Sequence, residues 1–218
     1  MTVKDILNIS FPAEFGSNED GEDTYAIEDV YNQLDSNVKT AYGASKFVIL
    51  LNDKEVVKVP FNGCFWYDDI DEEGGWRFDE FNNNDYCATE AAIYADAVAL
   101  GVEKFFASTK YYGSTVEGTP IYISERVYGL YENDDARYKI TSSEDSNKKA
   151  TEIRNGYSSP IACTEWLAKA IEFYGINAVM DLLAFIELEH ISDFHTGNIG
   201  FRKDGSPVIL DYSGYDEF

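Results

Sequence analysis

The sequence predicts an α+β fold, on three observations. Two short runs of β-branched and apolar residues, 47–51 and 55–60, flank a polar turn and indicate a β-hairpin. An alanine-rich stretch, 86–100, stands before Gly101 and is typical of a helix. Two more helical patterns and a second short hairpin follow in the last third of the chain. Strands and helices are therefore both expected in quantity.

Length and composition limit the possible functions. The 218 residues allow one large domain or two small lobes, and a hydrophobic content of 44% is enough to build a core. Lys and Arg number 17 against 40 Asp and Glu, which gives a net charge of −23. This charge repels nucleic-acid phosphates and anionic membranes, so we expect neither as a direct partner. It could attract a basic protein, or it could only keep the chain soluble.

The sequence also predicts a cytoplasmic location. The three cysteines, 64, 87 and 163, form no CxxC pair, so neither a disulfide framework nor a zinc site is indicated. The first ten residues contain no basic leader, and no apolar stretch of 18 residues occurs. We therefore expect no export and no membrane span.

The first half of the chain contains two acidic segments. Residues 1–40 are predicted to be an acidic N-terminal arm, solvated or weakly helical over 13–30. Residues 62–85 read as an acidic insertion that is rich in aromatic side chains. This insertion is expected to be either a surface loop or a contact site for another protein.

The remaining elements follow from local patterns. Glu90, Ile93 and Ala97 share one stripe of the helix 86–100, and a carboxylate on an apolar stripe requires a partner. The other predictions are strands around 104–111, 120–127, 199–202 and 208–210, a polar loop over 132–158, a helix from Ser159-Pro160 to Tyr174, and a further helix capped by Asn177.

Three polar residues near the second hairpin point to chemistry. Asp193 and Asn198 stand five residues apart before the hairpin, and Asp211 follows its second strand, so the three side chains can converge. Phosphoryl transfer needs such a set: one carboxylate orients and deprotonates the acceptor hydroxyl, while an Asn and a second Asp hold magnesium. Taken singly, each residue could equally cap a loop or a strand end.

The segment Asp193-x-x-x-x-Asn198, with the following hairpin and Leu210-Asp211-Tyr212-Ser213-Gly214, resembles the catalytic and metal-binding loops of the protein-kinase-like superfamily. Within it, the order of motifs looks most like that of the small early serine/threonine kinases of podophages. The resemblance implies a bilobal protein-kinase-like fold with a minimal, truncated C-terminal lobe. It places the sheet lobe at 41–128 and the helical lobe at 129–218.

The same resemblance implies roles for individual residues and makes ATP and Mg²⁺ the expected cofactors. Lys58 would hold the α- and β-phosphates, with Glu90 as its partner. The segment 42–46 takes the place of the glycine-rich turn but has one glycine where the family commonly has three. The implied site residues are Asp193, Lys58 and Glu90 for catalysis, Gly43, Ser45, Lys58, Glu125 and Val127 for the nucleotide, and Asn198 and Asp211 for the metal.

The chain departs from the family pattern in two respects. Ile191 replaces the histidine that many relatives have two residues before the aspartate, and His190 is one position away; His195 is expected to orient the loop. Only seven residues follow Asp211, so we expect no activation segment and no ordinary peptide-binding subdomain.

Three functions remain open from the sequence. The first is an ATP- and Mg²⁺-dependent serine/threonine kinase that modifies host proteins and, if phage-encoded, works in the host cytoplasm. The second is an acidic kinase-fold pseudoenzyme that binds and inhibits a basic host protein, either a DNA-binding or a defence protein. The third is a small-molecule phosphotransferase related to the antibiotic kinases, which share the DxHxxN pattern.

Overall fold

The structure is a computed structural model of the whole chain, and it describes residues 1–12, 27–43, 45–61, 64–70, 76–82, 85–130, 141–156, 160–161 and 163–213. The chain divides into two compact units. We call Met1–Thr89 with Thr109–Glu125 the sheet unit, and Glu90–Ser108 with Arg126–Phe218 the helical unit. The predicted domain boundaries after residues 40 and 128 stay a prediction.

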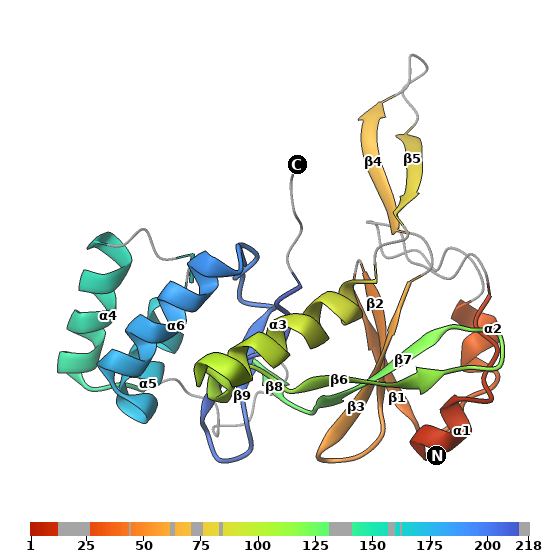
Figure 1. Ribbon diagram of the computed structural model, residues 1–218, viewed down its shortest axis with the longest axis horizontal. Helices are drawn as coiled ribbons and strands as arrows, with labels where there is room; N and C mark the ends of the chain where they lie inside the picture. The colour runs from red at the N-terminus through yellow and green to blue at the C-terminus, as the bar shows by residue number, and fades with distance from the viewer. Residues whose placement is uncertain are drawn as a thin grey trace. The chain divides into compact units, whose positions relative to one another are not determined.

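The sheet unit contains a five-stranded antiparallel sheet with the strand order β1-β2-β3-β7-β6 (Figure 1). Its strands are β1 (Lys39–Tyr42), β2 (Lys46–Leu50), β3 (Glu55–Pro60), β6 (Thr109–Ser114) and β7 (Pro120–Glu125). The predicted hairpin is confirmed as β2 and β3. The side chain of Asn52 forms its turn, because Oδ1 accepts hydrogen bonds from the N–H groups of Lys54 and Glu55.

One face of this sheet packs into a core. Phe47 and Ile49 on β2, and Val57 and Val59 on β3, are all fully buried, as period-two alternation requires. The short helices α1 (Val3–Ile6) and α2 (Ile27–Tyr31) belong to the same unit, and the ring of Tyr31 meets that of Phe47 edge to face at 5.8 Å. The described residues before β1 thus contribute side chains to a core.

The acidic insertion contains a second hairpin rather than a loop alone. Strands β4 (Cys64–Ile70) and β5 (Trp76–Asn82) pair antiparallel and form a separate two-stranded sheet (Figure 1). The parts of the insertion at 62–63, 71–75 and 83–84 lie outside the described residues. The alternation of aromatic and acidic residues fits a strand pair better than the loop that its charge suggested.

Helix α3 (Tyr86–Leu100) has the predicted bounds and continues from the sheet unit into the helical unit. Asp85 caps its first turn, since Oδ1 accepts from the N–H of Ala88 at 2.9 Å. Its other carboxylate oxygen accepts from the hydroxyl of Tyr122 at 2.6 Å. Burial, with a further contribution from this hydrogen bond, raises the pKa of Tyr122. At the far end, Gly101 takes a φ of 75° and ends the helix.

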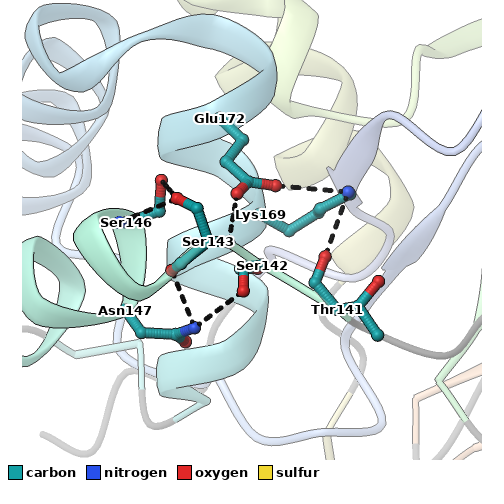
Figure 2. Close-up of polar contacts among 7 residues, drawn as sticks. All are labelled: Thr141, Ser142, Ser143, Ser146, Asn147, Lys169 and Glu172. Atoms are coloured by element: carbon teal, nitrogen blue, oxygen red, sulfur yellow. Dashed lines mark hydrogen bonds and ion pairs between the residues drawn. The ribbon is translucent and has the colours of Figure 1, made fainter.

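Three further helices belong to the helical unit: α4 (Glu144–Gly156), α5 (Thr164–Tyr174) and α6 (Ile176–Leu188) (Figure 1). The prediction of a loop was wrong over α4. Ser143 caps this helix, since its Oγ accepts from the N–H of Ser146 at 3.2 Å, and its backbone N–H donates to Glu172 of α5 (Figure 2). Ala150 and Ile153 are its buried apolar residues, too few for the sequence pattern to indicate a helix.

The starts of α5 and α6 also differ from the prediction. Helix α5 begins at Thr164 with Cys163 in the cap position, whereas the predicted cap Ser159 lies outside the described residues. Helix α6 begins at Ile176, so Asn177 is inside its first turn and Gly175 is the cap. Both helices bury apolar side chains, among them Val179, Leu182 and Ile186 of α6, and α5 buries Trp166 completely.

A three-stranded sheet, β10-β9-β8, completes the helical unit. Its strands are β8 (Tyr128–Gly129), β9 (Ile199–Phe201) and β10 (Pro207–Ile209). Gly200 permits close approach here, because a Cβ would lie 2.2 Å from the carbonyl oxygen of Tyr128. Its own carbonyl accepts a hydrogen bond from the indole of Trp166 at 3.0 Å.

The α+β fold class is confirmed, with an antiparallel sheet unit and a helical unit. In the described part of the chain, no helix has the length and apolar composition of a membrane span.

Candidate active site

The loop that carries Asp193 is fixed at both ends by the fold of the helical unit. At the end of α6, His190 takes a left-handed φ of 54°, and the N–H of Ile191 donates to the carbonyl of Ile186 at 3.0 Å. This is a Schellman ending, in which the chain reverses direction within two residues. Ile191 and Phe194 are both buried in the core cluster, so the positions on either side of Asp193 are held by packing.

Asn198 and Asp193 are joined directly. The side-chain amide of Asn198 donates to the backbone carbonyl of Asp193 at 2.9 Å and to its Oδ2 at 3.0 Å. Asn198 is 7% exposed, whereas the side chain of Asp193 is 30% exposed, so the amide is buried and the carboxylate still reaches solvent. Because both amide hydrogens point to Asp193, the carbonyl Oδ1 of Asn198 is the atom that could bind a cation.

His195 lies against the same carboxylate. The N–H of Gly197 donates to Nδ1 of His195 at 2.9 Å, so the hydrogen of the neutral ring is on Nε2. That Nε2 is 3.6 Å from Oδ1 of Asp193. A Cβ on residue 197 would come within 2.6 Å of the imidazole, so the ring requires glycine there. His195 therefore has the loop-orienting position expected, whereas the requirement for Gly197 was not predicted.

Asp211 joins this group through the backbone. The N–H groups of Leu210 and Asp211 both approach the carbonyl oxygen of Asn198, at 2.9 and 3.4 Å. The next residue, Tyr212, is fully buried and donates its hydroxyl hydrogen to the carbonyl of Ala107 at 2.7 Å. The hairpin β9–β10 thus returns the backbone of Asp211 to the loop that contains Asn198. The predicted convergence of the three side chains stays a prediction.

The donor set fits a hard divalent cation. An amide oxygen from Asn198 and a carboxylate from Asp211 are oxygen ligands, which Mg²⁺ prefers, and one or two carboxylates with substrate phosphates are its usual protein environment. Among the described residues no three His, Cys, Asp or Glu side chains gather as a metal site. A magnesium ion at this position would thus share its coordination with phosphate oxygens.

Three of the predicted nucleotide residues, Lys58, Gly43 and Ser45, lie in the first stretch of the sheet unit. Lys58 is on β3, the central strand, and is 6% exposed, while its cross-strand partners are Val48 and Tyr122. Gly43 and Ser45 lie in the turn between β1 and β2, where the N–H of Gly43 donates to the carbonyl of Lys46 at 3.1 Å.

Two predicted residues, Glu90 and Glu125, lie where the chain passes from the sheet unit to the helical unit. Glu90, at 0% exposure, is the first residue of α3 that belongs to the helical unit. Glu125 ends β7, and the chain enters the helical unit at Arg126, one residue before Val127. The predicted contact between Lys58 and Glu90 stays a prediction, as does the nucleotide-binding role of the segment around Val127.

The sequence matches no protein-family model and no curated protein. Among solved structures, the GDP and kanamycin complex of APH(2″)-IIia is similar over 86% of this chain and 70% of that chain. The identity is 12% and the TM-score is 0.37. This likeness carries no conclusion about function. Any functional assignment depends on the residues of the chain itself.

Proposed function

We propose that this protein is a kinase-like phosphotransferase that uses ATP and Mg²⁺. The observation that supports this most directly is the hydrogen bonding of Asn198, whose side chain binds Asp193 in the same loop and whose backbone carbonyl meets the N–H of Asp211. The β9–β10 hairpin is what returns Asp211 to this loop. The sheet unit supports the proposal independently, because it buries Lys58 on its central strand.

In the proposed reaction, an acceptor hydroxyl oxygen forms a bond to the γ-phosphorus of ATP. The bond from that phosphorus to the β–γ bridging oxygen breaks, and ADP leaves. Asp193 orients the hydroxyl and accepts its proton on the carboxylate. Asn198 and Asp211 hold Mg²⁺, which offsets the negative charge of the phosphates.

The acceptor that we propose is a Ser or Thr hydroxyl of a protein. Its basis is the resemblance of the motif order to small podophage serine/threonine kinases, which further leads us to propose host proteins as substrates. The net charge of −23 favours a basic substrate, since the field of the protein attracts cationic partners at low ionic strength.

The test is transfer of labelled γ-phosphate to a basic protein such as histone and to host extract, with wild type, Asp193→Asn and Asp181→Asn. Asp181 is an exposed carboxylate on α6 and serves as the matched control. Transfer by wild type and by Asp181→Asn, but not by Asp193→Asn, is the expected result. Equal transfer by wild type and Asp193→Asn would contradict the role of Asp193.

The net charge also favours a second candidate, a kinase-fold protein that binds a basic partner without phosphorylating it. A calorimetric titration with Mg·ATP separates the two. A protein that does not bind Mg·ATP, yet forms a complex with a basic protein that dissociates as salt rises, would fit this candidate and not the first.

A further inference from the structure

The sheet unit contains a second buried lysine. Lys46 is the first residue of β2, and only 4% of its surface is exposed, less than for Lys58. Lysine is rarely buried to this extent, because an ammonium group loses its hydration and must be compensated by an anionic or polar group. Two neighbouring lysines, Lys39 on β1 and Lys54 in the turn between β2 and β3, are exposed. Burial therefore distinguishes Lys46 and Lys58 from their neighbours.

The strand register places Lys46 and Lys58 on the same face of the sheet. Lys58 is paired with Val48, and Lys46 precedes Val48 by two residues, so the three side chains point to one side. Lys46 itself is opposite Pro60, which follows Lys58 by two residues. The two lysines are therefore diagonal neighbours across β2 and β3, roughly 7–8 Å apart at Cα. Side chains of this length can reach a single polyphosphate from such positions.

Lys46 also stands where the glycine-rich turn of kinases has a glycine. When Val48 is aligned with the valine of the pattern G-x-G-x-x-G-x-V, Gly43 takes the second glycine position and Lys46 the third. The N–H of Gly43 already donates to the carbonyl of Lys46 within the hairpin. A turn with one glycine and this N–H engaged offers few backbone donors to a phosphate. A cationic side chain at position 46 would replace them.

The charge of the whole molecule makes local cations necessary at such a site. With a net charge of −23, the protein repels a nucleoside triphosphate at long range. Two lysines on one face create a local positive potential. When a polyanion lies beside both, its attraction to the two ammonium groups offsets the repulsion between them.

We propose that Lys46 is a second phosphate-binding lysine, which binds the nucleotide polyphosphate together with Lys58. This inference rests on the proposed function, because it assumes that the nucleotide lies on this face of the sheet. It goes beyond the family pattern, which has a glycine at this position and takes its phosphate contacts there from the backbone.

The experiment compares the affinities of ATP, ADP and adenosine, each with Mg²⁺, by calorimetry. The variants are Lys46→Met, which removes the charge at similar length, and Lys46→Arg, which keeps the charge. Lys54→Met, an exposed lysine of the same hairpin, is the matched control. Thermal unfolding of each variant shows whether it is folded.

Lys46→Met is expected to bind ATP at least roughly tenfold more weakly than wild type does. Its affinity for ADP should fall less, and its affinity for adenosine should not change. Lys46→Arg and Lys54→Met should keep affinities close to those of wild type.

If Lys46→Met is folded and binds ATP as wild type does, or loses affinity for ATP and adenosine equally, the inference is wrong and the proposed function stands. If Lys46→Met does not fold, Lys46→Gln takes its place, and a folded Lys46→Gln variant that binds ATP as wild type does overturns the inference. Wild type that binds neither ATP nor adenosine overturns both.

Discussion

Asn198 donates both of its side-chain amide hydrogens to Asp193, one to the backbone carbonyl and one to the carboxylate. Asn198→Ala should therefore destabilise the fold by about 1–2 kcal/mol, because two partly buried acceptors lose their donor. It should also abolish Mg²⁺-dependent ATP binding, because the proposed metal ligand is lost. Urea unfolding and calorimetry measure the two effects.

Asn147→Ala is the matched control for this variant. Asn147 also donates twice through its side-chain amide, to the carbonyls of Ser142 and Ser143 at the start of α4 (Figure 2). It should lower the free energy of unfolding by a similar amount and leave ATP binding intact. Loss of ATP binding in both variants would show that the effect of Asn198→Ala is only structural.

Gly197→Ala should disturb the loop through His195. The added methyl group would lie 2.6 Å from the imidazole, so the ring must leave its position beside Asp193. We expect phosphotransfer to fall by roughly tenfold or more, in the range of general acid–base effects. In a His195→Ala background the same methyl group meets no ring, and Gly197→Ala should then have little further effect. Additive effects of the two substitutions would contradict this coupling.

His190→Gly should stabilise the protein. His190 is exposed and has a φ of 54° at the end of α6, a conformation that costs a side-chain-bearing residue more than it costs glycine. The expected gain in the free energy of unfolding is about 0.5–1 kcal/mol. His190→Val should have the opposite effect, because a β-branched residue is strained at positive φ. Equal stability of the two variants would show that the helix ending relaxes without cost.

The contact between Glu172 and the start of α4 should make stability depend on pH. The backbone N–H of Ser143, with further contributions from its hydroxyl and Lys169, lowers the pKa of Glu172 (Figure 2). An acid with a lowered folded-state pKa stabilises the fold above its unfolded value near 4.5 and loses this contribution as pH falls.

Glu172→Gln should accordingly be less stable than wild type at pH 7, and this difference should be smaller at pH 3. Glu187→Gln, an exposed acid on α6, is the control and should show no such difference. Urea unfolding at the two pH values measures it. A difference between Glu172→Gln and wild type that is the same at both pH values would rule out ionisation of Glu172 as its cause.

Local signals in the sequence predicted most of the elements and missed those without such signals. Helix α3 was predicted with its bounds, because alanines and Gly101 mark its length. Strand β1 was not predicted, since Lys39–Tyr42 is only four residues long and contains no large aliphatic residue. Helix α4 was missed because its mean character is polar. The contact of its start with α5, from the N–H of Ser143 to Glu172, joins residues 29 apart and leaves no local signal.

Local signals also account for the part of the candidate site that could be predicted. Asp193 and Asn198 are close in sequence, so their spacing alone indicates a shared loop, and the hairpin that returns Asp211 carries a turn signal at Asp204-Gly205. The place of Lys46 depends on the register between β2 and β3, which spacing within one strand does not reveal.

The path of the chain limits how this protein can be divided. Each unit is assembled from two separate stretches, with crossings after Thr89, Ser108 and Glu125. A fragment that stops at residue 89 would lack β7, the strand that hydrogen-bonds to β3 beside Lys58. Neither unit can therefore be cut out as one continuous segment. Recombination or gene fusion would have to transfer both units together, from the first strand to the last hairpin.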